Sequence, residues 1–214
     1  MNITVFGANG RIGQLLLRQA LQDGYAVTGF VRRPDALTWQ HERLRVIVGT
    51  YEDPDSVAEA VQAGDVIFST LGPALSMKRE VKDLPIARAH EAIMRAMEKV
   101  GKRRFITLAT PTVRAKEDKK QLVTVLPEIM AKLLYPTGYQ EMKVIETLIH
   151  SSSLDWTVVR IVNPNVQSNG AGYAVSFGDT KGKMTVSRWN VARCMLDATS
   201  RNDWIHKMPI VFNR

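Results

Sequence analysis

The stretch that decides the fold lies at the start of the chain and reads Ile3-Thr4-Val5-Phe6-Gly7-Ala8-Asn9-Gly10-Arg11-Ile12-Gly13. Strand-forming residues run directly into glycines spaced three apart, and apolar side chains then recur at helical spacing through residues 11–22. In such a unit Gly7 allows a tight turn, Gly10 lets the backbone approach a pyrophosphate, and Gly13 lets helix and strand pack closely. Free amides and the positive end of the helix dipole attract phosphate. We therefore expect residues 7–13, including Asn9, Arg11 and Ile12, to bind a dinucleotide.

The rest of the chain alternates short apolar runs with helical patterns. Strands are predicted at 26–31, 44–48, 65–68, 104–108, 155–162 and 209–212, and helices at 53–61, 85–100, 121–134, 139–151 and 188–199. This order favours an α/β fold with a Rossmann-type doubly wound parallel sheet. We expect one domain over residues 1–214 with a small C-terminal substrate-side portion. Long loops at 72–84, 111–120 and 163–183 follow strand ends, where ligands bind, although disorder explains them equally well.

Charge is distributed unevenly along the 214 residues. Residues 1–100 carry 12 basic and 12 acidic side chains, whereas residues 101–214 carry 17 and 9, which accounts for the net charge of +8. A basic half suits an anionic cofactor as well as nucleic acid. The densest cluster, residues 114–120, mixes both signs and contains no aromatic residue, so it is interpreted as a solvated loop and no nucleic-acid partner is expected.

Cysteine and histidine usage argues against a metal site. Cys194 is the only cysteine and sits in an apolar helical stretch, so we expect a buried thiol, and the four histidines lack ligand spacing. No apolar run approaches the roughly 18 residues of a membrane helix. We therefore expect a cytoplasmic protein without a metal or a membrane partner, acting on a small molecule as a monomer or homodimer.

The end of the second predicted strand bears on the choice of cofactor. An acidic residue there would bind the ribose 2′-hydroxyl of NAD, whereas arginine pairs with the 2′-phosphate of NADP. This chain has Arg32 and Arg33 at that place, and no acid before Asp35. The pattern predicts NADP(H), with exposed surface arginines as the alternative interpretation.

Several motifs together resemble a known family. They are Gly7-x-x-Gly10-x-x-Gly13, Val31-Arg32-Arg33-Pro34, Gly64-Asp65-Val66-Ile67, Arg103-Arg104-Phe105-Ile106, Leu154-Asp155-Trp156-Thr157-Val158-Val159-Arg160 and Ser187-Arg188-Trp189-Asn190-Val191-Ala192. The chain resembles the atypical short-chain dehydrogenase/reductases, and within them the NAD(P)H-binding, NmrA-like group that includes biliverdin reductase B/flavin reductase and quinone reductases.

The resemblance implies further cofactor contacts. Arg32 and Arg33 match the 2′-phosphate segment; Thr70, Leu71 and Gly72 match the stretch beside the riboses; Leu108, Ala109 and Thr110 match the strand end beside the nicotinamide. Four positions depart from the family pattern: Thr50 where Asp is common after Gly49, Ala109 before Thr110 where two serines are frequent, Ile161 in place of a proline, and Asn190 in place of an aspartate.

Tyr139 and Lys143 show the Tyr-x-x-x-Lys spacing of short-chain reductases, which places both side chains on one helix face. Lys143 would bind the nicotinamide ribose and lower the pKa of Tyr139, whose phenol would protonate the product, while Thr110 holds the substrate oxygen. For a flavin or quinone, whose reduced form is a delocalised anion, Tyr139 could instead be a pocket wall. Trp156 is interpreted as a core residue, and Arg160 either faces the pocket or forms a structural ion pair.

Three functions remain open from the sequence. The first is an NADPH-dependent reductase of a flavin, quinone or similar small acceptor, a carbonyl compound included. The second is a non-catalytic NADP(H)-binding redox sensor of the NmrA type, because fold alone does not assign function. The third is an NAD(P)-dependent epimerase or isomerase, which would suit the Tyr139–Lys143 pair.

Overall fold

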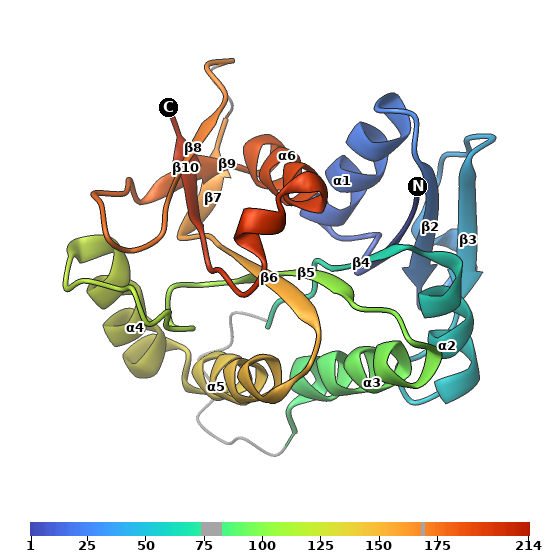
Figure 1. Cartoon of the computed structure of the whole chain (residues 1–214), viewed down its shortest axis with the longest axis horizontal. Helices are drawn as coiled ribbons and strands as arrows, with labels where there is room; N and C mark the ends of the chain where they lie inside the picture. Colours follow the sequence, from blue (N-terminus) through green and yellow to red (C-terminus); the bar gives the residue numbers. More distant parts are fainter. Residues whose placement is uncertain (74–82, 168–169) are drawn as a thin grey trace.

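A twisted sheet with helices on both faces forms the framework of the protein (Figure 1). The computed structural model describes residues 1–73, 83–167 and 170–214. Within these ranges eight strands lie in the order β3-β2-β1-β4-β5-β6-β10-β8. Their bounds are β1 Asn2–Phe6, β2 Ala26–Val31, β3 Leu44–Val48, β4 Val66–Ser69, β5 Arg104–Ala109, β6 Asp155–Arg160, β8 Tyr173–Ser176 and β10 Ile210–Asn213. All pairs are parallel except β10–β8.

The helices cover the two faces of the sheet separately. Helices α1 (Arg11–Gln22) and α6 (Arg188–Asp197) pack together on one face. On the other face α3 (Pro85–Val100) packs between α2 (Pro54–Ala63) and α5 (Pro136–Ser151), as Figure 1 shows. Helix α4 (Leu122–Leu134) comes directly before α5 and lies beside it, at the left of the view. No helix within the described ranges is long and apolar enough to cross a membrane.

Each face of the sheet has its own apolar core, as parallel strands require. Ile3 and Val5 pack under α1 and α6, whereas the next residue, Phe6, points to the opposite core with Ile67 and Phe105. Successive side chains of these strands point to opposite faces, and both faces are buried, so each central strand is a continuous apolar run in the sequence. Such runs can be predicted from the sequence alone.

Local signals set several helix boundaries. The Asp53 side chain accepts a hydrogen bond from the Asp55 amide at 3.2 Å, and Pro54 occupies the first position of α2. Helix α3 likewise begins at a proline, Pro85, and ends at Gly101, whose φ of 74° is the left-handed conformation that favours glycine. The predicted helix over 85–100 is therefore confirmed.

The C-terminal third differs from expectation. The segment 163–183, interpreted as a long loop, contains β7 (Asn163–Val166) and β8, apart from residues 168–169, which lie outside the described ranges. Strand β7 pairs with β9 (Thr185–Ser187) in a small second sheet, and β8 closes the edge of the main sheet antiparallel to β10. Both strands are short and only partly buried, so they lack the strong apolar pattern of the central strands. Of the loop 72–84, residues 74–82 also lie outside the described ranges.

The strand order positions the functional site. In the order 3-2-1-4-5-6, the chain leaves β1 toward one side of the sheet and β4 toward the other, which opens a crevice at their carboxyl ends. The glycine loop follows β1 and Thr70 follows β4, so two of the sequence-predicted segments meet at this point.

Candidate functional site: a dinucleotide crevice at the carboxyl ends of the strands

The glycine loop forms a tight turn that leads into α1. Gly7 has a φ of 79°, and its carbonyl accepts a hydrogen bond from the Gly10 amide at 2.9 Å. A Cβ on Gly13 would lie 2.3 Å from the Gly7 carbonyl oxygen, so only glycine fits there. Gly10 caps α1 without any side-chain hydrogen bond, and no acidic residue stands in the first turn. The first amides of α1 thus lack partners within the helix, a cradle suited to phosphate.

Thr70 joins the glycine loop to the end of β4. Its amide donates to the Phe6 carbonyl at 2.9 Å, and its hydroxyl donates to the Gly7 carbonyl at 3.0 Å. A Cβ on Gly7 would meet the Thr70 hydroxyl at 2.8 Å and the Leu71 side chain at 3.1 Å. Among the described residues, none lies within 4 Å of a Cβ placed on Gly72.

The end of β2 carries the two predicted arginines at the rim of a hollow. Asn9, Arg32, Arg33 and Ala36 line a cavity of about 410 Å³ beside the glycine loop. The Arg33 guanidinium lies 3.8 Å from the Asp35 carboxylate, and both side chains are largely exposed. No carboxylate lines this hollow among the described residues. The arrangement provides cations for an anionic group and, among the described lining residues, no carboxylate that could bind a ribose diol.

Tyr51 lies beside the glycine loop and Arg32, although no motif in the sequence singles it out. It follows β3, next to the position where Thr50 replaces the family's usual aspartate, and its ring packs on Phe30 with centroids 5.4 Å apart. Burial raises the pKa of Tyr51 to about 12, with an opposing effect from the Arg32 charge and from a hydrogen bond with the Gly7 backbone. The phenol therefore supports the glycine loop. An aromatic residue just after a strand is the only signal in the sequence.

The carboxyl end of β5 supplies the predicted nicotinamide-side residues. Leu108 and Ala109 are buried, and Thr110 stands at the boundary with its hydroxyl 2.6 Å from the Thr112 hydroxyl. The Ile161 amide donates to the Ala109 carbonyl at 2.9 Å, which fixes the strand end against the residue following β6.

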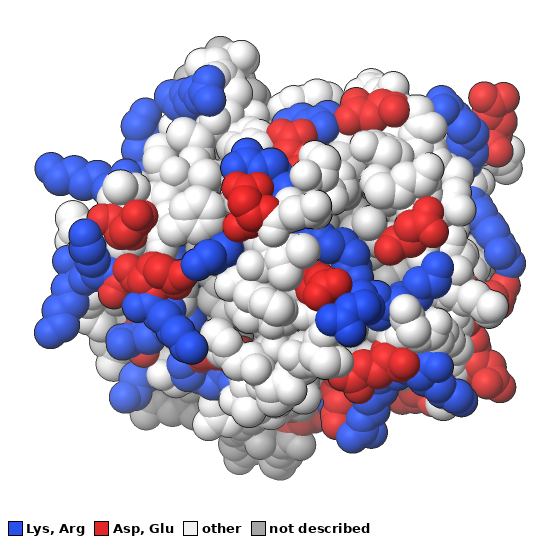
Figure 2. Space-filling model, viewed as in Figure 1, with Lys and Arg blue, Asp and Glu red and all other residues white. Residues whose placement is uncertain are grey.

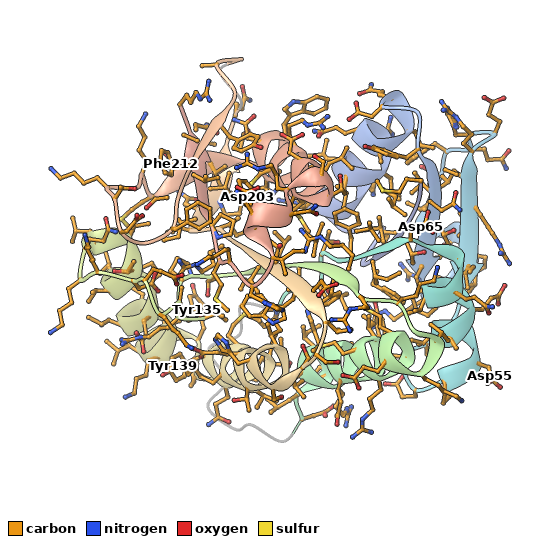
Figure 3. The ribbon with its side chains drawn as sticks, viewed as in Figure 1. Asp55, Asp65, Tyr135, Tyr139, Asp203 and Phe212 are labelled. Atoms are coloured by element: carbon orange, nitrogen blue, oxygen red, sulfur yellow. The ribbon has the colours of Figure 1, made fainter. Side chains whose placement is uncertain are left out.

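Tyr139 and Lys143 lie in the first half of α5. Because α5 leads into β6, it runs against the strand direction and brings its first turns to the carboxyl ends of the sheet. Tyr139 stands near Tyr135 at the junction of α4 and α5, and its amide donates to the Tyr135 carbonyl at 2.9 Å (Figure 3). The Lys143 ammonium forms an ion pair with Glu146.

A polar cluster surrounds this pair. The Glu146 carboxylate also accepts a hydrogen bond from the Arg114 amide at 3.1 Å. The pKa of Arg114 is raised, chiefly by its hydrogen bond with Glu128, with smaller contributions from Glu146 and Tyr139. Among the described residues no hydrogen bond links Thr110 with either Tyr139 or Lys143, so the structure places these three at one end of the sheet without joining them directly.

Glu141, inside the Tyr-x-x-x-Lys motif, has a structural task that the sequence does not reveal. Its buried carboxylate accepts hydrogen bonds from the amides of Ala87 at 2.6 Å and Ile86 at 3.2 Å. These are first-turn amides of α3, so a side chain from α5 caps that helix and complements its dipole. The contact fixes α5, and with it Tyr139 and Lys143, against α3.

A buried histidine lies beneath the segment that follows β4. The Nε2 atom of His90 lies 3.1 Å from the hydroxyls of both Ser69 and Thr107, and its Nδ1 donates to the Ile86 carbonyl at 2.9 Å. Since a carbonyl only accepts, Nε2 is the acceptor in the neutral ring. Burial lowers the pKa of His90 to about 4, and the bond to Ile86 opposes this in part. The ring links β4, α3 and β5.

Arg160 forms the structural ion pair rather than facing the crevice. Its side chain is 0% exposed, and it donates to the two carboxylate oxygens of Asp118 at 2.6 and 2.8 Å. It also donates to the Met208 and Val113 carbonyls. The Asp118 carboxylate accepts in addition from the Ala115 amide at 2.9 Å. The long loop 111–120, whose residues 114–120 are interpreted from the sequence as solvated, is therefore anchored to β6, while its lysines remain exposed.

Two other residues lie where the sequence predicts them. Trp156 is buried in the core under α5, with the His206 ring 5.2 Å away. Cys194 is fully buried, and burial raises its pKa. No group of three or more metal-ligating side chains was found in the described part of the chain.

Comparison with known proteins places this geometry in a family. A model of a family described as NAD(P)H-binding matches residues 7–202. A short-chain dehydrogenase/reductase from Veillonella parvula, solved in complex with NADP, has a TM-score of 0.77 at 21% identity, over 99% of this chain and 94% of that one. An anaerobillin reductase from Escherichia coli O157:H7 has a TM-score of 0.78 at 20% identity, over 100% and 97%. A putative NAD-dependent epimerase/dehydratase from Bacillus halodurans has a TM-score of 0.74 at 21% identity, over 100% and 94%.

These solved structures share the fold, in agreement with the predicted Rossmann-type sheet. The family match begins at the glycine loop and covers the segments that carry Arg32, Thr70, Thr110 and Lys143. By its sequence and by the crevice that the strands build, this chain belongs to the NAD(P)H-binding family.

Proposed function

We propose that this protein is an NADPH-dependent reductase that transfers hydride to a flavin, a quinone or a related small acceptor. The observation that carries the cofactor choice is the hollow at the end of β2, where Arg32 and Arg33 stand beside Asn9 without a carboxylate among the described lining residues. Two guanidinium groups there favour a 2′-phosphate over a ribose diol. The Veillonella neighbour with NADP supports the same preference.

The binding residues follow from the crevice. Amides at the start of α1, among them those of Arg11 and Ile12, would bind the pyrophosphate, with Gly7, Gly10 and Gly13 allowing the close approach. Thr70, Leu71 and Gly72 would pass the riboses, and Leu108 and Ala109 would pack beside the nicotinamide. The bound cofactor supplies a hydride, and the acceptor takes up that hydride together with one proton from solvent or from a side chain.

The polar cluster on α5 favours an acceptor whose reduced form is a delocalised anion. The Lys143 ammonium is paired with Glu146, so less of its positive charge is available to stabilise a negative charge that forms on the Tyr139 oxygen. A strongly basic alkoxide would need that proton donor, whereas a flavin or quinone anion can be protonated by water. Thr110 would then orient the acceptor, and Lys143 would hold the cofactor ribose. The anaerobillin reductase among the structural neighbours supports reductase chemistry on this fold.

Titration with NADPH and with NADH tests the preference of the protein for NADPH. We expect NADPH to bind more tightly, and Arg32→Gln/Arg33→Gln to lose roughly 10- to 100-fold in NADPH affinity while NADH binding stays unchanged. Arg95→Gln is a suitable control, because the Arg95 and Arg33 side chains are both 76% exposed and each lies beside a carboxylate. Equal affinity of the unaltered protein for both cofactors would refute the role of the two arginines.

The reaction is tested by turnover of FMN and of a simple quinone with NADPH. We expect oxidation of NADPH with at least one acceptor, and a raised KM for NADPH in Lys143→Met. A loss in kcat of about 100-fold or more in Tyr139→Phe would assign proton donation to the phenol, and a smaller loss would support a pocket wall. Tight NADPH binding without turnover of either acceptor would contradict the reductase and favour a redox sensor.

A further inference from the structure

Helix α4 presents an apolar face to the outside of the molecule. Leu122 is 73% exposed, Leu133 69% and Ile129 50%, and Val125, Leu126 and Met130 are also exposed. These positions recur every three or four residues, so they lie on one side of the helix and form a continuous stripe, roughly 20 Å long at 1.5 Å per residue. Large apolar side chains gathered in this way mark an interaction surface, unlike single exposed ones.

The stripe belongs to an anchored helix. Val123 and Thr124 are buried, and the Gln121 side chain and the Thr124 hydroxyl form a capping box at its start. The Thr124 hydroxyl also donates to the Lys119 carbonyl at 2.7 Å. At its middle, Glu128 on α4 binds Arg114. The inner side of α4 is thus fixed to the protein, which leaves the apolar side free for a partner.

Two segments of chain at or next to this helix, residues 114–134 and 177–184, are rich in lysine. The Gln121 side-chain amide donates to the Gly178 carbonyl at 2.9 Å and to the Thr180 carbonyl at 3.0 Å, which holds the second segment against the start of α4. Figure 2 shows blue side chains gathered along this left side of the molecule. The exposed lysines of the two segments are Lys116, Lys119, Lys120, Lys132, Lys181 and Lys183.

The charge of these lysines is largely uncompensated. Within the described ranges none of the six has an ion-pair partner. The acids nearby are mostly engaged elsewhere: Glu117 pairs with Lys207, Asp118 with Arg160 and Glu128 with Arg114, so that among the described residues of the two segments Asp179 is the one acid without an ion pair. An apolar helix face flanked by unpaired lysines is the pattern of a helix that lies in the interface of an anionic membrane.

We propose that α4 docks this protein on the surface of a bilayer containing anionic lipids. The apolar stripe enters the boundary between headgroups and acyl chains, and the six lysines lie at the level of the lipid phosphates. A second copy of the chain fits this face less well. If α4 of two copies packed antiparallel, Lys119 and Lys120 of each copy would lie next to Lys132 of the other. Like charges would then meet at both ends of the contact.

This contact differs from the membrane partner that the sequence argues against. That expectation rests on the lack of an apolar run long enough to span, and α4, with 13 residues, falls short of the roughly 20 required. Interfacial helices need only a face, with cations beside it. Docking of this kind does not depend on which acceptor the protein reduces, so it stands apart from the proposed function.

Co-sedimentation of the full chain with vesicles tests the proposal. One set of vesicles is phosphatidylcholine alone, and the other contains phosphatidylserine as well. We expect binding to the anionic vesicles only, with release at high salt because the lysine contribution is screened. Ile129→Ser/Leu133→Ser should weaken binding about tenfold or more, and Lys119→Gln about fivefold.

Matched variants are available elsewhere on the surface. Val46→Ser/Val48→Ser removes exposed apolar side chains from β3, and Lys99→Gln removes an exposed lysine from α3; both should bind as the unaltered protein does. NADPH affinity and melting temperature report whether each variant is folded. If a variant does not fold, the dependence of vesicle binding by the unaltered protein on lipid composition and salt still tests the proposal.

Two results would overturn the proposal. One is the lack of any preference of the unaltered protein for anionic vesicles, whether it binds to neither vesicle type or equally to both. The other is a dimer in sedimentation velocity that Ile129→Ser/Leu133→Ser dissociates, which would assign the α4 face to a second copy of the chain.

Discussion

His90 should make the stability of this protein depend on pH in a defined window. The ring is fully buried, and its Nε2 accepts hydrogen bonds from Ser69 and Thr107 only while it is neutral. Its pKa is lowered from 6.5 to about 4 by burial. In the unfolded chain the ring takes up a proton near pH 6.5, whereas the folded protein resists protonation until about pH 4. The stability contributed by the neutral ring is therefore complete above pH 6.5 and is lost as the pH falls toward 4.

The magnitude follows from the two pKa values. At 1.36 kcal/mol per pH unit, the difference between 6.5 and about 4 corresponds to roughly 3 kcal/mol in the free energy of unfolding. Between pH 7 and pH 4.5 the loss should be about 2.5 kcal/mol. Because the ring is fully buried, solvent screening reduces this value little.

Urea unfolding measured by tryptophan fluorescence at several pH values tests this, since Trp156 and Trp204 are buried reporters. His90→Gln cannot titrate, so its free energy of unfolding should fall by about 2.5 kcal/mol less than that of the unaltered protein between pH 7 and 4.5. His41→Gln, at an exposed position, should follow the unaltered protein. A constant difference between His90→Gln and the unaltered protein at every pH would refute the reasoning.

Three further substitutions test contacts at the site and around it. Gly13→Ala places a Cβ 2.3 Å from the Gly7 carbonyl oxygen, so we expect a loss of about 2 kcal/mol in stability and of NADPH binding, measured by urea unfolding and titration. Asp118→Asn leaves the buried Arg160 without a counter-ion and should cost about 3–5 kcal/mol. The Asn190 side-chain amide donates to two oxygen atoms at 2.9 and 2.8 Å. Asn190→Asp replaces this donor with a carboxylate that repels both oxygens, so the free energy of unfolding should fall by about 2 kcal/mol.

The first two of these substitutions have a matched control and a contrary outcome. Gly182→Ala meets only ordinary contacts at 3.5 Å, so it should leave stability and NADPH binding intact. Asp203→Asn removes the carboxylate of an exposed ion pair with an arginine and should change the free energy of unfolding by less than about 1 kcal/mol. If Gly13→Ala binds NADPH with full affinity, the packing argument for Gly13 is wrong. If Asp118→Asn is as stable as Asp203→Asn, the argument from the buried charge of Arg160 is wrong.

The sequence is informative where the signal is local. The continuous apolar runs of the central strands, the proline at the start of α3 and the left-handed glycine at its end are all written within a few residues. The segment 163–183 escapes prediction because β7 and β8 are short, partly buried and stabilised by pairing with β9 and β10, which come later in the chain. A strand that depends on such a partner has little pattern of its own.

The sequence alone was enough to predict the glycine loop and the strands and helices of a nicotinamide-dinucleotide fold, because a turn, a helix start and a strand end need only neighbouring residues. The role of Arg32 and Arg33 in binding stays a prediction. The tertiary structure decided everything that joins distant residues. Asp118 and Arg160 are 42 residues apart, and Glu141 reaches the start of α3 across 54. Only folding brings such charges together, since a buried charge is stable only where its partners also arrive. Folding also brings the segment that carries Lys181 and Lys183 to the start of α4, where the Gln121 side chain holds it.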